Sequence, residues 1–249
     1  MAKKILLITG GSRGIGAATA RLAAARGYDV CVNYRRNRDA ADGVVSQIRA
    51  AGARALAVAA DVSLEDDVRR LFDVCDTSFG RLDALVNNAG VLETQMRLDA
   101  MDAARISRVL ATNVVGPFIC ARDAVKRMSK KYGGQGGAIV NVSSGAARLG
   151  SPGEYIDYAA SKGALNSMTL GLSREVAEEG IRVNAVLAGH IYTELHASGG
   201  EPNRLERVRD QVPMKRGGTA DEVANAILWL LSDEASYVTG SLLDVAGGK

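Results

Sequence analysis

The stretch Ile5-Leu6-Leu7-Ile8-Thr9-Gly10-Gly11-Ser12-Arg13-Gly14-Ile15-Gly16 decides the fold of this chain of 249 residues. It predicts a short buried strand, a glycine-rich turn and a helix that continues to Arg26. In such a unit the glycines stand where the chain turns and where a pyrophosphate would approach the backbone, and helix N-terminal N–H groups meet the anion. The glycine spacing is G-x-x-x-G-x-G rather than the common G-x-G-x-x-G, so the loop alone leaves an ordinary turn open.

Short β-rich apolar runs alternate with segments of helical period along the rest of the chain, which is typical of successive βαβ units. We therefore expect an α/β fold of the Rossmann type, a doubly wound parallel seven-stranded sheet flanked by helices on both faces. Ser63, with Asp66 three positions later, predicts a capping box before a helix that ends at Phe79. The predicted strands are Ile5–Ile8, Val30–Tyr34, Ala55–Ala60, Ala84–Val86, Ala138–Val142, Ile181–Leu187 and Leu242–Val245.

No linker, internal repeat or low-complexity tract interrupts this pattern, and α/β domains commonly reach this length. We expect residues 1–249 to form a single domain. The stretch 193–213 fits least well, because residues 194–202 are polar and turn-rich. A segment of this kind inside a compact domain is often a substrate lid, and the alternative is a surface excursion without a role.

The composition is that of a globular protein, with 47% hydrophobic and 24% charged residues. A formal net charge of +3 is too small to indicate a nucleic-acid partner. The basic cluster Lys126, Arg127, Lys130 and Lys131 is typical of cations near a helix C-terminus. No long apolar h-region or run of 18 apolar residues follows Met1, so we expect a cytoplasmic protein without a membrane partner.

Cysteine and histidine usage argues against disulfide and metal chemistry. Cys31, Cys75 and Cys120 lie far apart in apolar segments, and we expect buried reduced thiols. His190 and His196 have no cysteine close by and do not form an H-E-x-x-H pattern. The sequence therefore predicts no metal site.

A tyrosine and a lysine stand four residues apart in Tyr158-Ala159-Ala160-Ser161-Lys162, at the start of a segment of helical period. Positions i and i+4 share one face of a helix, so both side chains should point into the same space. A nearby ammonium stabilises phenolate, which would bring the pKa of Tyr158 from about 10 toward the working range. A surface pair without a role is the alternative, because Tyr-x-x-x-Lys alone occurs by chance.

Two hydroxyls end the predicted strand Ile139-Val140-Asn141-Val142-Ser143-Ser144. Ligands gather at strand carboxyl ends in open α/β sheets, and a serine there can donate a hydrogen bond to a substrate oxygen. The same serine can equally be a turn or cap residue.

Together these residues resemble the single-domain short-chain dehydrogenases/reductases over essentially the whole chain, and among them the glucose dehydrogenase-like and 3-oxoacyl-[acyl-carrier-protein] reductase-like members. Asn113 matches the helix asparagine of the family's catalytic tetrad, and Asp61-Val62 matches its adenine-contacting pair. The ordered matches that carry the likeness are Thr9 to Gly16, Asn87-Asn88-Ala89-Gly90, Ser144 and Tyr158-x-x-x-Lys162.

The resemblance implies an oxidoreductase that interconverts a carbonyl and a secondary alcohol with a nicotinamide cofactor. Tyr158 would be the general acid/base, Ser144 would orient the substrate carbonyl, and Lys162 would hold the nicotinamide ribose. Asn113 would complete a proton relay through water. The implied cofactor-binding residues are Gly10, Ser12, Arg13, Gly14, Ile15, Gly16, Tyr34, Arg35, Asp61, Val62, Asn88, Ala89, Gly90, Tyr158, Lys162, Gly189, Ile191 and Thr193.

The resemblance also implies a homotetramer. The family usually pairs the long helices that correspond here to residues 102–131 and 158–179, and it joins subunits again near Leu242 to Val245.

Two departures from the family pattern bear on the site. The catalytic serine usually precedes the tyrosine by 13 positions, whereas Ser144 lies 14 and Ser143 lies 15 positions before Tyr158. We prefer Ser144, with one extra residue in the loop 145–157. The usual Pro-Gly after the sixth strand is Ala188-Gly189, which predicts a less preorganised cofactor loop.

The end of the second strand predicts that NADP(H) is preferred, with NAD(H) possible. Enzymes of this fold that choose NAD usually place a carboxylate there, which repels a 2′-phosphate. That position is Tyr34, followed by Arg35 and Arg36, and Arg13 should approach the same phosphate from the glycine loop. Guanidinium groups suit phosphate, although these arginines can also be merely solvated.

Two other classes of function stay open beside the enzyme. A catalytically silent NADP(H)-sensing regulator would need the glycine loop but not Tyr158 or Lys162. A nucleic-acid-binding module has only the basic cluster in its favour and lacks a stacking platform. The substrate stays unassigned, but polar residues in the loops 145–157 and 193–213 favour a small oxygenated molecule, namely Arg148, Glu154, Tyr155, His196 and Glu201.

Overall fold

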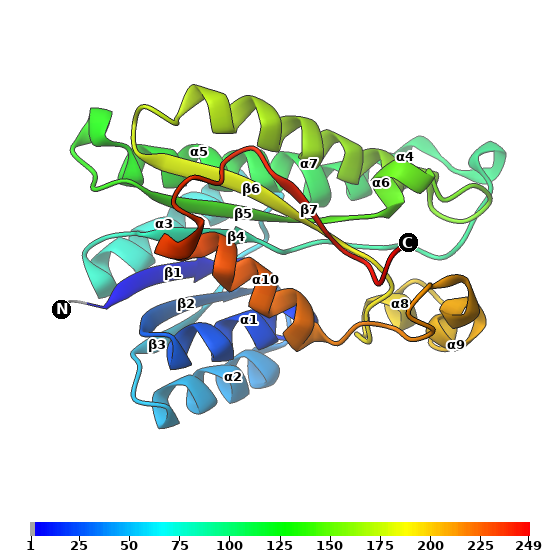
Figure 1. Cartoon of the computed structure of the whole chain (residues 1–249), viewed down its shortest axis with the longest axis horizontal. Helices are drawn as coiled ribbons and strands as arrows, with labels where there is room; N and C mark the ends of the chain where they lie inside the picture. The colour runs from blue at the N-terminus through cyan, green and yellow to red at the C-terminus, as the bar shows by residue number, and fades with distance from the viewer. Residues whose placement is uncertain (1–2) are drawn as a thin grey trace.

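A seven-stranded sheet of order β3-β2-β1-β4-β5-β6-β7, parallel throughout, forms the centre of the computed structural model (Figure 1). The structure describes residues 3–249, except for the side chain of His196. All seven predicted strands are present, with boundaries that differ by a few residues. Their bounds are Lys4–Ile8 (β1), Tyr28–Tyr34 (β2), Ala55–Ala59 (β3), Ala84–Asn87 (β4), Gly137–Ser144 (β5), Ile181–Ala188 (β6) and Leu242–Val245 (β7).

Helices cover both faces of the sheet, as expected for a doubly wound Rossmann-type fold (Figure 1). The predicted helical stretch 102–131 consists of α4, a π-helical turn at Ala111–Val115, α5 and a short 3₁₀ turn. The α-helices are Gly14–Ala25 (α1), Arg38–Ala50 (α2), Glu65–Phe79 (α3), Ala103–Leu110 (α4), Gly116–Met128 (α5), Ala146–Leu149 (α6), Ile156–Glu175 (α7), Leu195–Ser198 (α8), Arg204–Val208 (α9) and Ala220–Leu231 (α10).

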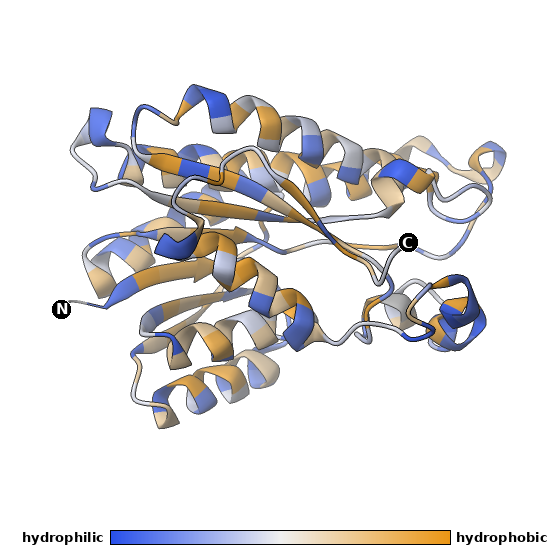
Figure 2. Ribbon diagram, in the orientation of Figure 1, coloured by the Kyte–Doolittle hydropathy of each residue, from blue (hydrophilic) through white to orange (hydrophobic). Residues whose placement is uncertain are grey.

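The apolar core has two halves because successive residues of a strand point to opposite faces. Leu6 and Ile8 of β1 pack into the half that α1, α2 and α10 cover, while Ile5 and Leu7 pack into the half under α3, α5 and α7. Figure 2 shows hydrophobic residues gathered along the strands and on the inner sides of the helices. Continuous apolar runs in the sequence are therefore strands that are buried on both faces.

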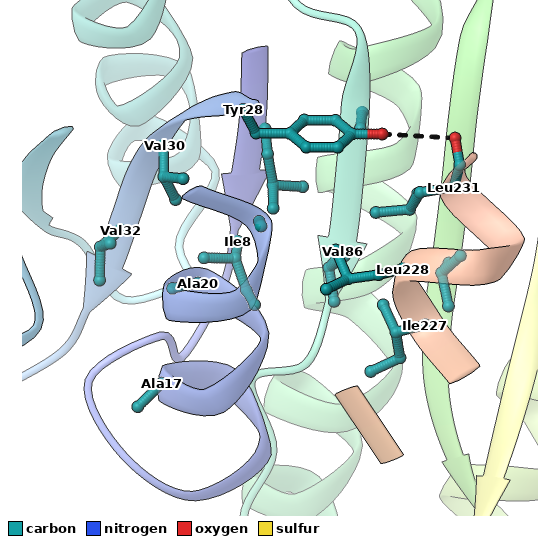
Figure 3. Close-up of a cluster of buried hydrophobic side chains, with 14 of the residues drawn as sticks. Ile8, Ala17, Ala20, Tyr28, Val30, Val32, Val86, Ile227, Leu228 and Leu231 are labelled. Atoms are coloured by element: carbon teal, nitrogen blue, oxygen red, sulfur yellow. Dashed lines mark hydrogen bonds between the residues drawn. The ribbon is translucent and has the colours of Figure 1, made fainter. Parts of the chain in front are cut away.

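One buried tyrosine ties the first half-core to the last helix. Figure 3 shows Tyr28 at the start of β2, with its hydroxyl directed at the Leu231 carbonyl of α10 at 3.5 Å. Val30, Ile8 and Leu228 fill the same cluster. The C-terminal part of the chain is thereby packed against the N-terminal βαβ unit.

The predicted capping box at Ser63 is wrong. The Ser63 hydroxyl donates to Asp61 at 2.7 Å, and the N-cap of α3 is Leu64, without a side-chain hydrogen bond. A capping box does form at α10, where the Thr219 hydroxyl accepts from Glu222 N and the Glu222 carboxylate accepts from Thr219 N. The helix begins one residue later than predicted, so Ser63 stands before the N-cap, and its hydroxyl bonds locally to Asp61 instead.

Other expectations about the surface and the thiols are met. Lys126 and Arg127 lie in the last turn of α5, as expected, and they also pair with Asp123 at 3.7 Å and with Asp76 at 2.7 Å. The three cysteines are buried and free. Within residues 3–249, no helix is long and apolar enough to cross a membrane.

Candidate active site

A cavity of about 750 Å³ lies along the carboxyl ends of the strands, from the glycine loop to the first turn of α7. The strand order reverses between β1 and β4, which is the position where doubly wound sheets bind ligands. The sequence-predicted residues that line the cavity are Gly10, Ser12, Arg13, Gly14, Ile15, Tyr34, Arg35, Asp61, Val62, Asn88, Ala89, Gly90, Ser144, Tyr158, Lys162, Gly189, Ile191 and Thr193. Gly16 and Asn113 stand behind its wall.

Two close backbone approaches leave no room for side chains in the glycine loop. A Cβ on Gly10, which has a φ of 61°, would lie 2.9 Å from the Ala89 Cα, and a Cβ on Gly16 would lie 2.4 Å from the Gly10 carbonyl oxygen. Asn88 holds this arrangement by donating to the carbonyls of Thr9 and Gly10 at 3.0 and 2.9 Å. The N-terminus of α1 is therefore presented to the cavity without side chains in front of it, which fits a pyrophosphate.

Thr9 and Asn33 fix the same loop, and neither was predicted as a site residue from the sequence. The Thr9 hydroxyl accepts the backbone N–H groups of Asn88 and Ala89, each at 3.0 Å, and the Asn33 side chain accepts the Gly10 N–H at 3.2 Å. Both side chains are buried at strand ends. The available signals were a polar residue directly after an apolar strand for Thr9 and a polar residue within a mainly apolar strand for Asn33.

Tyr158 and Lys162 lie on the same face of α7, as their spacing predicts. The Lys162 Nζ lies 5.5 Å from the centre of the Tyr158 ring and donates to the Val142 carbonyl at 2.8 Å. Burial lowers the pKa of Lys162 to about 8. The ammonium therefore faces both the phenol and the end of β5.

The pKa of Tyr158 moves in the direction opposite to the one expected. Burial raises it from 10.0 to about 12, and a hydrogen bond with the Ser144 hydroxyl acts in the lowering direction. The desolvation of the phenolate outweighs the effect of this hydrogen bond. The Tyr158 phenol therefore keeps its proton at neutral pH.

Ser144, and not Ser143, meets the tyrosine. Ser144 hydrogen-bonds the Tyr158 phenol, whereas the Ser143 hydroxyl points the other way and donates to the Asn166 side chain at 2.6 Å. Both serines border the cavity, but adjacent side chains of β5 point to opposite faces, so only the Ser144 hydroxyl is turned toward Tyr158. The one extra residue in the loop 145–157 does not disturb this alternation.

Asn113 is fully buried in the π-helical turn between α4 and α5. Its Oδ1 accepts Val91 N at 2.8 Å, and its Nδ2 donates to Val91 O at 3.0 Å and to the Ser161 hydroxyl at 3.1 Å. A π turn is a rare insertion that often marks a functional position. Here it brings the asparagine between the segment after β4 and the first turns of α7.

The corner at Ala188 is held on both sides by the sheet. Gly145 N donates to the Ala188 carbonyl and Gly189 N donates to the Val245 carbonyl, each at 3.0 Å. A Cβ on Gly189 would lie 2.7 Å from the Ala246 Cα. Strand pairing thus supplies order to a corner where the sequence predicts a less preorganised loop.

Four charged side chains join the loop before α7 to the stretch 193–213. Arg204 and Arg207 of α9 each pair with both Glu154 and Glu201. Glu201 also hydrogen-bonds Gln95 of the segment after β4. Figure 1 shows α8 and α9 together beyond the carboxyl end of the sheet. Glu154 and Glu201 therefore form ion pairs within the cavity wall. Arg204 and Arg207, three positions apart in the chain, were not predicted from the sequence.

The adenosine end of the cavity is basic. Arg13, Arg35 and Arg36 line it, and no carboxylate follows β2 directly. No group of three or more residues from His, Cys, Asp and Glu that could hold a metal ion occurs in the described part of the chain.

Comparisons with known proteins point to one family. The family model described as Enoyl-(Acyl carrier protein) reductase matches residues 10–249. The chain is 61% identical to the uncharacterized oxidoreductase YgfF of Escherichia coli, covering 98% of this chain and 99% of that one. It is 36% identical to a 3-oxoacyl-[acyl-carrier-protein] reductase of Staphylococcus epidermidis, with 98% of each covered.

Two solved structures that hold a nicotinamide cofactor agree with this chain in fold. A short chain dehydrogenase from Burkholderia cenocepacia in complex with NADP superposes with a TM-score of 0.91 at 34% identity, covering 98% of this chain and 97% of that one. A 3-ketoacyl-(acyl-carrier-protein) reductase from Brucella melitensis complexed with NADH gives a TM-score of 0.91 at 34% identity, with the same coverage.

Proposed function

Because the chain belongs to the short-chain dehydrogenase/reductase family of oxidoreductases, we propose that it reduces a carbonyl of a small oxygenated substrate to a secondary alcohol with NADPH, and catalyses the reverse oxidation. One observation carries the proposal: the Tyr158 phenol, hydrogen-bonded to Ser144 and beside Lys162, faces a cavity that continues to the glycine loop. The proton donor Tyr158, the orienting hydroxyl of Ser144 and the glycine loop that would bind the dinucleotide thus line the same cavity.

Each residue of the site has a distinct task. The Ser144 hydroxyl orients the substrate oxygen, and the Tyr158 phenol donates the proton that this oxygen needs as the carbonyl is reduced. Lys162 holds the nicotinamide ribose and the end of β5. The dinucleotide, when bound, supplies the hydride. A phenol with a pKa of about 12 stays protonated at neutral pH, which supports the reductive direction.

Asn113 orders the wall beside this centre, and we propose that it also takes part in a proton relay. Its Oδ1 and Nδ2 hold the Val91 backbone, and its Nδ2 also donates to Ser161, one residue before Lys162. This placement supports a relay that returns a proton to Tyr158 through water.

The preference for NADPH is supported by the basic adenosine end. Arg13 and Arg35 present guanidinium groups from the glycine loop and from the end of β2, where a 2′-phosphate would lie. Asp61 and Val62, after β3, would contact the adenine. NADH lacks the phosphate and loses these charge-assisted bonds.

We also propose a cytoplasmic homotetramer. Val115, Phe118 and Trp229 are exposed apolar side chains on or beside α5 and on α10, at 46%, 51% and 37% exposure. Such surfaces are typical of contacts between subunits. Light scattering at micromolar concentration tests the assembly, and a monomer mass contradicts it.

The activity is tested with purified protein, NADPH and a panel of small carbonyl compounds that contains ethyl 3-oxobutanoate, butane-2,3-dione and 4-nitrobenzaldehyde. We expect NADPH oxidation with at least one of them, and a loss of about 10²–10⁴-fold in turnover for Tyr158→Phe with NADPH affinity retained. Tyr155→Phe, a neighbouring tyrosine on the cavity wall, is the matched control and should lose far less. A Tyr158→Phe variant with more than about a tenth of wild-type turnover would refute the proton donor.

A further inference from the structure

A fully buried ion pair stands directly behind the proposed proton donor. Arg105 of α4 contacts Asp157 of α7 with Nε to Oδ2 at 2.8 Å and Nη2 to Oδ1 at 3.4 Å. The two side chains are only 5% and 2% exposed. Asp157 immediately precedes Tyr158, so this pair lies at the root of the site.

The pair connects three segments that the fold brings together. The Asp157 Oδ1 accepts the backbone N–H of Tyr158 at 2.9 Å, and the Arg105 Nη1 donates to the Thr94 carbonyl at 2.6 Å. Arg105 N in turn donates to Asp102, the N-cap of α4, at 2.7 Å. The first turn of α7, helix α4 and the wall after β4 are therefore joined through two side chains.

A second contact holds the other side of the same residue. The Ser161 hydroxyl donates to the Tyr158 carbonyl at 2.6 Å and accepts from Asn113 at 3.1 Å. The backbone of Tyr158 is thus fixed at its N–H through Asp157 and at its carbonyl through Ser161. Both contacts connect Tyr158 to the helical segment 103–115, the first through Arg105 and the second through Asn113.

Stability alone is a poor reason for this arrangement. Removing two charges from water costs free energy, and replacing a buried ion pair by apolar residues is often neutral or stabilising. Neither Arg105 nor Asp157 lines the cavity, so neither touches cofactor or substrate. What the pair does supply is a fixed, two-point connection at the base of Tyr158.

We propose that Arg105 and Asp157 are positioning residues that set the place of the Tyr158 phenol, an inference that rests on the proposed function of Tyr158. A displacement of about 1 Å in a reacting group can cost about 10²-fold in rate. The pair also keeps the surroundings of the phenol neutral, because the guanidinium cancels the carboxylate one residue away. Lys162 and Ser144 remain the groups that act on the phenol directly.

The test uses Asp157→Asn and the double variant Arg105→Met/Asp157→Asn in the full-length protein. The double variant leaves no unpaired buried charge and keeps an amide oxygen that can accept the Tyr158 N–H. It is therefore expected to fold, whereas Arg105→Met alone leaves a carboxylate buried without its partner. The measurements are kcat and KM with the best carbonyl compound of the panel, NADPH dissociation by calorimetry, and thermal unfolding.

We expect the double variant to lose at least about tenfold in kcat while the Kd of NADPH stays within about twofold. In Asp157→Asn the unpaired Arg105 cation lowers the pKa of both the Tyr158 phenol and the Lys162 ammonium, so the alkaline limb of the kcat profile moves to lower pH. The double variant returns this limb to its wild-type position. A double variant with wild-type kcat, or an unmoved limb in Asp157→Asn, overturns the inference.

A matched control exists at the opposite end of the sheet. Asp29, with a side chain 4% exposed, accepts the Arg54 backbone N–H at 2.8 Å and the Arg54 Nε at 2.6 Å. Asp29→Asn removes an equally buried carboxylate far from the cavity, although its partner Arg54 is exposed, and should lower the unfolding temperature without changing kcat. An equal loss of kcat in Asp29→Asn would show a general stability effect and overturn the positioning role.

Failure of this inference is distinguishable from failure of the proposed function. If Tyr158→Phe abolishes turnover while the double variant behaves like wild type, only the positioning role is wrong. If Tyr158→Phe remains active, the proton donor itself is wrong, and the inference falls with it.

Discussion

The Nε of Arg35 lies 2.7 Å from the Oδ2 of Asp61, so an ion pair joins the residue after β2 to the loop after β3 across the adenosine end of the cavity. An incoming 2′-phosphate would compete with the Asp61 carboxylate for this guanidinium. Arg35 is half exposed, so the existing pair is weak and readily exchanged.

We expect Arg35→Ala to lower the ratio of kcat/KM for NADPH over NADH by about tenfold, and Arg13→Ala/Arg35→Ala to lower it by about a hundredfold. The loss falls on NADPH, because only the phosphate gains charge-assisted hydrogen bonds from these side chains. Steady-state kinetics with both cofactors measures the ratio.

Arg38→Ala is the control for this experiment. Arg38 also follows β2, but it pairs with Asp42 at 3.3 Å and does not line the cavity. Its removal should leave the ratio unchanged. Equal efficiency with both cofactors in the wild type, or an unchanged ratio in the double variant, contradicts the assignment of NADPH.

Cofactor binding should weaken as pH rises through about 8, because burial lowers the pKa of Lys162 from 10.5 to about 8. Above that pH the folded protein loses the ammonium that holds the ribose. Calorimetric titration with NADPH between about pH 7 and pH 9 measures the change. Lys162→Met should bind weakly and without this pH dependence, and a wild-type affinity that is flat over the range contradicts the role.

The same group gives a stability effect of defined sign. Between about pH 8 and 10.5 the unfolded chain holds a proton on Lys162 that the folded chain has released. Stability from this group therefore increases with pH over that window. The difference in unfolding free energy between wild type and Lys162→Met should move in favour of wild type over the window.

Arg204→Met should raise the KM for the carbonyl substrate at least about tenfold with little change in NADPH affinity. The variant leaves the carboxylates of Glu154 and Glu201 facing each other with one arginine between them, so α9 no longer stays against the loop before α7. Hydrogen exchange of residues 195–211 should increase. Arg209→Met, which removes an exposed pair with Glu206, is the control.

Acid should release the same contact. A hydrogen bond from Arg207, opposed by burial and helped by Arg204, lowers the pKa of Glu201 from 4.5 to about 2. The stabilisation that the Glu201 carboxylate gives to the folded state is complete above about pH 4.5 and is lost as pH falls toward 2. The rate of proteolysis within residues 195–211 of the wild type should therefore increase over this acid range. A rate that does not change would show that the contact does not hold the segment.

Local patterns determined the architecture. The strands are mainly apolar runs because both faces of a parallel strand are buried, and Gly16 is required by its close approach to the Gly10 carbonyl within one strand–turn–helix unit. The pairing of Tyr158 with Lys162 follows from the helical repeat alone. These features were predictable because each depends on residues that are neighbours in the sequence.

Contacts over long sequence separations were decided only by the tertiary structure. Ser144 faces Tyr158 because β5 presents that side of the strand to α7, and a count of loop residues could not establish this. Arg105 meets Asp157 across 52 residues, and Glu154 meets Arg204 across 50. The pKa of Tyr158 rises because the fold removes it from water, whereas the sequence shows only the nearby lysine. Local periodicity places a side chain on a face, but only packing determines what that face meets and how much solvent remains.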